Sequence, residues 1–64
     1  MPKYDVDVQL SGQDGNAFMV IGRVRVALKS IGVKGKELDE FSNEAMSGDY
    51  DHLLTTCAEW VNVS

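Results

Sequence analysis

Cysteine and histidine are nearly absent from this sequence of 64 residues, where each occurs once, as Cys57 and His52. A single cysteine excludes a disulfide bond within the chain. One cysteine and one histidine also fall short of the paired ligands that form a tetrahedral zinc site. We therefore predict that neither a disulfide nor a metal ion stabilises the fold, and we predict no cofactor.

Long apolar segments are missing as well. No run approaches the roughly 20 apolar residues that span a bilayer. The N-terminal residues Met1–Asp5 become polar at once, unlike a secretory signal peptide. The sequence thus predicts a cytoplasmic protein without membrane contact, in which Cys57 stays reduced.

Positive charge is scarce: six Lys and Arg residues stand against ten Asp and Glu residues, which gives a formal net charge of −4. Domains that bind nucleic acid usually carry a basic surface that neutralises phosphates, so we expect no direct nucleic-acid binding. An acidic surface can instead imitate nucleic acid. The carboxylates available for such mimicry are those of Asp39, Glu40, Glu44, Asp49 and Asp51. They form a sparse array, and mimicry therefore ranks third among the functional hypotheses.

The chain is short enough for one domain only, which we expect to span residues 1–64. A domain of this size buries about 60% of the surface that its unfolded chain exposes, so its core has little stability to spare. Small domains compensate with disulfides, metal ions or self-association. Since the first two are not expected here, the size favours a homo-oligomer.

The first regular element that the sequence contains is a strand. Residues Tyr4–Leu10 alternate between apolar side chains (Val6, Val8 and Leu10) and polar ones, which is the period of a half-buried strand. Residues Ser11–Gly15 include two glycines and an aspartate, and they predict a tight loop.

A first helix follows this loop. Asn16 is a good N-cap residue, because its side-chain oxygen accepts a hydrogen bond from a free backbone N–H of the first turn. Apolar residues then recur every three or four positions, which is the period of a helix packed on a core. This stripe consists of Ala17, Val20, Ile21, Val24, Ala27, Leu28 and Ile31. Gly32 supplies the expected stop.

Three other residues of this helix bear on function. Gly22 costs about 1 kcal/mol relative to alanine in a helix interior. We therefore expect a neighbouring helix, or less readily a ligand, to approach its bare backbone. Arg23 and Arg25 lie away from the centre of the stripe, where arginines form surface ion pairs or bind a phosphate or carboxylate.

Two more helices complete the pattern. The second begins at Gly35 or Lys36 and closes at Gly48, for which we predict the left-handed conformation. Asp49 then caps a third helix. The apolar stripe of the second helix is Leu38, Phe41, Ala45 and, less clearly, Met46; that of the third is Tyr50, Leu53, Leu54, Cys57, Ala58 and Val61, with Trp60 at its end.

The C-terminal residues Val61–Val63 either extend the third helix or form a short strand with Val61 and Val63 facing inward. We favour the strand, because a lone first strand would leave both of its backbone edges unpaired. The predicted fold is a small α+β domain of order β-α-α-α-β, with three helices packed on a short two-stranded sheet. An open edge of this sheet is available to another subunit.

The loop before the first helix is one candidate binding site. Asp14, Gly15 and Asn16 lead into a helix N-terminus, where free backbone N–H groups attract anions. The loop has neither a P-loop nor a dinucleotide fingerprint, so a capped turn is the simpler explanation. Arg23, about two turns into the helix, brings a positive charge to this site if a neighbouring subunit closes the gap.

The start of the third helix is the other candidate. Asp49, Tyr50, Asp51 and His52 include the groups of general acid–base catalysis. Consecutive residues at a helix start point in different directions, however, and capping and the helix dipole account for the two aspartates. We predict no catalytic residue and treat Asp49, Tyr50 and Asp51 as candidate contacts for a ligand or partner.

Four segments of the chain carry a family resemblance. They are Val-Gln-Leu-Ser-Gly-Gln-Asp-Gly-Asn-Ala-Phe (Val8–Phe18), Ile-Gly-Arg-Val (Ile21–Val24), Ser-Gly-Asp-Tyr-Asp (Ser47–Asp51) and Trp60-Val61. On these segments the chain resembles a group of small uncharacterised proteins of bacteriophages and bacteria. The resemblance implies a phage or prophage accessory protein in the host cytoplasm, and by class it suggests an inhibitor of host defence.

These observations rank the functions. The first hypothesis is a non-enzymatic accessory protein that binds a host protein. The alternative is an oligomeric protein that sequesters a nucleotide or another small anionic ligand, in a pocket built between subunits from the Asp14–Asn16 loop, Arg23 and the Asp49–Asp51 turn. The third is the acidic nucleic-acid mimic.

Overall fold

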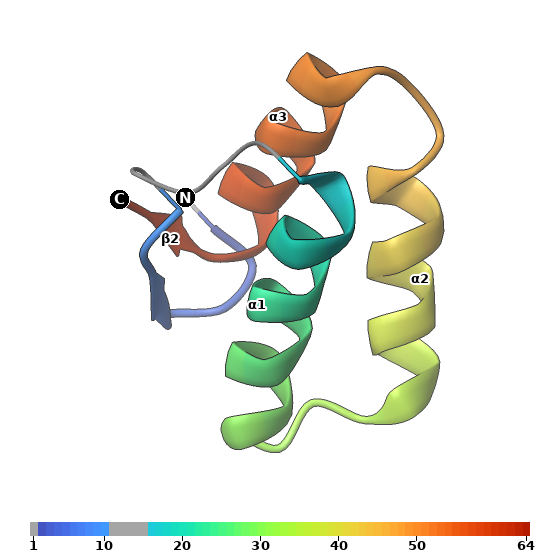
Figure 1. Cartoon of the computed structure of the whole chain (residues 1–64). Coiled ribbons are helices and arrows are strands. Elements are labelled where there is room, and N and C mark those ends of the chain that lie inside the picture. The colour runs from blue at the N-terminus through green and yellow to red at the C-terminus, as the bar shows by residue number, and fades with distance from the viewer. Residues whose placement is uncertain (1, 11–15) are drawn as a thin grey trace.

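The computed structural model describes residues 2–10 and 16–64. Within these residues the elements are β1 (Asp7–Val8), α1 (Ala17–Ser30), α2 (Gly35–Ala45), α3 (Tyr50–Trp60) and β2 (Asn62–Val63). The small sheet lies on one side of α1 and α3, and α2 lies on the other (Figure 1). The predicted α+β fold and its β-α-α-α-β order are confirmed.

The two strands are parallel, with Asp7 opposite Asn62 and Val8 opposite Val63. The first strand is shorter than the alternation from Tyr4 to Leu10 predicts. Further hydrogen bonds still tie that segment to the C-terminus, because Tyr4 N donates to Trp60 O at 2.9 Å and Leu10 N donates to Ser64 O at 2.8 Å. The predicted Ser11–Gly15 loop lies outside the described residues.

The ends of α1 follow from local chemistry. The side-chain oxygen of Asn16 accepts hydrogen bonds from the backbone N–H groups of Phe18 at 2.9 Å and Met19 at 3.3 Å, which confirms the predicted N-cap. Gly32 has a φ of 92°, a left-handed conformation that side chains disfavour, and the helix stops just before it.

The core lies where the three helices and the sheet meet. Val24, Leu28, Phe41 and Cys57 are fully buried in it. The other buried apolar residues are Val8, Leu10, Val20, Ile21, Leu38, Ala45, Leu53, Trp60 and Val61. Most predicted stripe positions are therefore correct.

Six predicted burials were wrong. Ala17 and Ile31 are exposed at the two ends of α1, Met46 is exposed just after α2, and Tyr50 and Ala58 are exposed on α3. Val63, predicted to face inward, is 40% exposed at the C-terminal end of the short strand β2.

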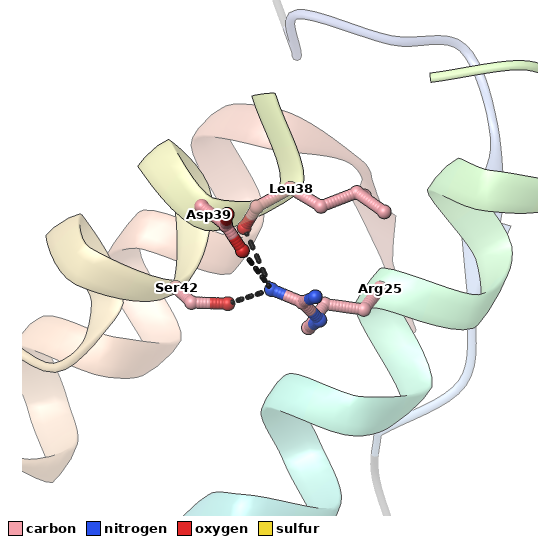
Figure 2. Close-up of polar contacts among 4 residues, drawn as sticks. All are labelled: Arg25, Leu38, Asp39 and Ser42. Atoms are coloured by element: carbon pink, nitrogen blue, oxygen red, sulfur yellow. Dashed lines mark hydrogen bonds and ion pairs between the residues drawn. The ribbon is translucent and has the colours of Figure 1, made fainter. Parts of the chain in front are cut away.

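Arg25 joins α1 to α2 (Figure 2). Its Nη1 donates to the backbone oxygen of Leu38 at 3.0 Å and to Ser42 Oγ at 2.6 Å, and it lies 3.4 Å from Asp39 Oδ1. Arg25 is therefore a partly buried contact between helices rather than the simple surface charge that its place in the sequence predicts.

Candidate functional site

The structure separates the predicted site residues into different places. Asp14 and Gly15 lie outside the described residues, while Asn16 forms the cap of α1. Asp49 and Tyr50 border a shallow hollow of about 120 Å³ that the start of α1 also lines. Arg23 lies elsewhere, in a groove between α1 and β1. The described residues thus do not bring Arg23 to the two helix N-termini.

Three of the first-turn backbone N–H groups of α1 and α3 have side-chain partners inside the chain. Asn16 accepts two of the N–H groups of α1. Asp49 Oδ1 accepts from His52 N at 2.9 Å, which confirms the predicted cap of α3. Asp49 and Asp51 are exposed carboxylates at the same end, and their negative charge opposes an incoming anion. This arrangement gives the anion-sequestering alternative little support.

The side chain of His52 contacts the turn between α2 and α3. Its Nε2 lies 2.9 Å from the backbone oxygen of Glu44 and 3.0 Å from Ser47 Oγ. Ser47 Oγ donates to the same Glu44 oxygen at 2.7 Å. Only a protonated Nε2 can donate to that carbonyl, and a protonated Nε2 cannot accept the proton of Ser47. The pair therefore caps the end of α2, and it lacks the arrangement that would activate a serine nucleophile.

Gly48 has a different role from the one predicted. Among the described glycines only Gly32 has a positive φ, so Gly48 is not left-handed. A Cβ at Gly48 would instead lie 2.8 Å from Cγ of His52. The glycine is needed for space beside the imidazole ring.

Among the described residues, Cys57 and Tyr4 have raised pKa values. Burial raises the pKa of the Cys57 thiol from 9.0 to about 11, so it stays protonated and weakly nucleophilic at neutral pH. A hydrogen bond from Tyr4 to Glu37 raises the pKa of the Tyr4 hydroxyl. No group of three His, Cys, Asp or Glu residues among those described is arranged to hold a metal ion.

The most unusual surface is the outer face of α1, which we call the α1 ridge and define as Phe18, Met19, Gly22 and Val26. Phe18 is 74% exposed and Val26 is 70% exposed. Phe18, Gly22 and Val26 are four residues apart, so they lie in one line along the helix. The sequence contained this signal, a second apolar line beside the core stripe, but reasoning from the core stripe alone missed it.

A groove runs along each side of the α1 ridge. The β1 groove, of about 580 Å³, lies between α1 and β1, and its walls include Asp7, Val8 and Arg23. The α2 groove, of about 480 Å³, lies between α1 and the start of α2. Gly22 and Val26 line both grooves. Because a Cβ at Gly22 would have no neighbouring atom of the described residues within 4 Å, Gly22 forms an open notch in the ridge.

The ridge is flanked by positive charge in a protein of negative net charge. Helix α1 carries Arg23, Arg25 and Lys29 and no Asp or Glu. Arg25 and Lys29 line the α2 groove, and Arg23 lines the β1 groove opposite Asp7. The surface therefore combines an apolar centre with charged margins, which is the usual composition of a protein-binding surface.

Comparisons with protein-family models, curated proteins and solved structures gave no match to this chain. None of the helices in the described residues has the length and apolar character that crossing a membrane requires. A functional assignment therefore depends on the chain's own surfaces.

Proposed function

We propose that this chain is a non-enzymatic accessory protein that binds another protein through the α1 ridge. The observation that carries the proposal is the exposure of Phe18 and Val26, at 74% and 70%. The two side chains lie on either side of the notch at Gly22, along one line of the helix. Contiguous apolar surface on a small protein marks interaction sites. Phenylalanine and methionine are also enriched where proteins meet.

The notch at Gly22 supports the same conclusion. A glycine inside a helix costs about 1 kcal/mol relative to alanine. Among residues 2–10 and 16–64, no helix packs close enough to Gly22 to need the space, since none of their atoms lies within 4 Å of an added Cβ. The expectation of a neighbouring helix within the chain was therefore wrong. Close approach by another molecule accounts for the glycine.

The resemblance to bacteriophage and bacterial proteins extends this proposal. It supports a phage or prophage accessory protein that acts in the host cytoplasm on a host protein, with inhibition of a host defence as the biological role. The surfaces described above support protein binding, whereas the phage origin and the choice of host partner rest on the resemblance.

The experiment is affinity capture from host extract, with the tagged wild-type protein and two matched variants. Val26→Asp places a charge in the ridge, and Ala58→Asp places one at an exposed position on α3. Both are surface changes, so both variants should keep the fold. We expect Val26→Asp to lose the captured host protein and Ala58→Asp to retain it. Equal capture by both variants would refute a role for the ridge.

The same purified protein tests the sequestering alternative. A bound nucleotide or other anion raises the melting temperature, and the rise grows with the logarithm of its concentration above Kd. If nucleotides shift the melting temperature and Arg23→Ala abolishes the shift, the alternative replaces protein binding. Absence of a shift, together with capture that depends on Val26, supports protein binding.

A further inference from the structure

We propose that the α1 ridge is also where two copies of this chain dimerise, with α1 of each copy lying against β1 of the other. This inference rests on the proposed use of the ridge as a protein-binding surface. It adds the identity of one partner, a second copy of this chain, so that it can be tested with the purified protein alone.

Charge complementarity is the first argument. Asp7 on β1 and Arg23 on α1 line opposite walls of the β1 groove and form no ion pair with each other. A symmetric dimer needs a surface that complements itself. A two-fold axis along the β1 groove places the Asp7 wall of each copy opposite the Arg23 wall of the other. Two equivalent ion pairs then form at the margins of one interface.

The apolar centre of the same face is the second argument. Met19, Val26 and Val8 line the β1 groove. In the proposed dimer the two grooves face each other, and the Met19 and Val26 side chains of both copies fill the space between them. Methionine suits this position, because its flexible side chain fills irregular gaps.

The open edge of the sheet is the third argument. Backbone groups of Val6, Val8 and Leu10 form hydrogen bonds with residues 62–64 of the C-terminal segment. Groups of the intervening residues Asp7 and Gln9 therefore point to the opposite edge, which has no strand partner within the described residues. An unpaired edge is a liability that proteins commonly cover with a helix. Helix α1 of a second copy provides that cover.

The size of the chain sets the expected strength. A stable interface buries about 800 Å² per partner, which is roughly one fifth of the 4131 Å² surface of this chain. One complete face of a body measuring 27 × 22 × 21 Å is therefore needed. The face formed by α1 and β1 has Val8, Met19 and Val26 at its centre. Because nearly all of this face must be buried to reach that area, we expect a reversible dimer that dissociates on dilution.

Sedimentation equilibrium of the purified wild type and three charge variants tests the arrangement. Asp7→Arg and Arg23→Asp each place two pairs of like charges in the interface. Each should weaken dimerisation about tenfold, which corresponds to about 0.7 kcal/mol for each of the two pairs. The double variant Asp7→Arg with Arg23→Asp restores opposite charges and should dimerise within a few-fold of the wild type. Thermal melting of the variants checks that the fold is intact.

The control is Glu59→Lys, a charge reversal at an exposed position of α3 outside the groove, which should leave the dimer constant unchanged. A wild type that stays monomeric at every concentration overturns the inference, as does a double variant no better than the singles. If the protein is monomeric while Val26→Asp still abolishes host capture, protein binding stands and only the second copy fails. If the single charge variants weaken dimerisation and the double variant restores it, while Val26→Asp still captures the host protein, the dimer stands and the host-binding role of the ridge fails.

Discussion

Gly48 leaves the space in which the imidazole ring of His52 lies. A Cβ at position 48 would come within 2.8 Å of Cγ and 2.9 Å of Cβ of His52. The ring in turn reaches the last turn of α2, where its Nε2 lies 2.9 Å from the backbone oxygen of Glu44. The two residues together fix the turn between α2 and α3, which is a pair of helices that packs directly through the core.

Gly48→Ala should destabilise the protein by about 1–3 kcal/mol, because the added methyl group forces the His52 ring away from Glu44. His52→Ala removes the ring but leaves its Cβ in place. The cost of Gly48→Ala should therefore be smaller in the His52→Ala background than in the wild type. Urea unfolding of the four proteins measures this coupling. Strictly additive costs would mean that the glycine serves another purpose.

Arg25→Ala should lower the free energy of unfolding by about 1–2 kcal/mol, since it removes hydrogen bonds from a charged donor to Leu38 O and Ser42 Oγ. Arg23→Ala is the matched control on the same helix; in dilute solution, where the proposed dimer is dissociated, it should change stability by less than about 0.5 kcal/mol. Chemical denaturation of both variants compares them directly. Equal effects would show that the bonds across the helix pair contribute nothing net.

These two sites show which features sequence reasoning reaches. The caps formed by Asn16 and Asp49 were predicted correctly, because each depends on a backbone group two or three residues away. The hydrogen bonds of Arg25 were not predicted, because their acceptors lie on α2, 13 to 17 residues further along the chain. Their formation depends on how α1 and α2 rotate against each other, and a local pattern does not specify this angle.

The buried faces of the helices were also predictable, because they too follow from a pattern of residues close together in the sequence. Burial of Val24 and Leu28 follows from one apolar stripe, and a period of 3.6 residues places the rest of that stripe. Gly48 shows the limit. A glycine after a helix usually signals a left-handed cap. Here the His52 ring four residues later imposes a steric requirement, and only the packed turn shows it.

The Cys57 thiol should resist a thiol reagent in the native protein at neutral pH and react once the chain is unfolded. Burial raises its pKa to about 11, against 9.0 when it is free. The folded state therefore holds the proton more tightly, so this stabilisation is complete below pH 9 and is lost as the pH rises toward 11. The raised pKa of Tyr4 acts in the same direction.

Denaturation curves at increasing alkaline pH measure this loss, with Cys57→Ala as the control. That variant should be less stable at neutral pH, because it leaves a small cavity in the core. Its stability should nevertheless decline less steeply above pH 9 than that of the wild type. Parallel declines in the two proteins would show that Cys57 has no part in the alkaline transition.

Gly22→Ala should stabilise the folded monomer and at the same time weaken its binding to partners. The position is helical and open, so alanine fits without a clash and should raise the free energy of unfolding by about 0.5–1 kcal/mol. Gly32→Ala should do the opposite, because its φ of 92° is strained for any side chain. The methyl group at position 22 also fills the notch shared by the two grooves, so host capture and dimerisation should both weaken although the monomer is more stable.

Thermal melting and sedimentation on the same samples compare the two effects. A Gly22→Ala protein that is more stable and binds as well as the wild type would leave the glycine unexplained and remove the notch from the binding surface.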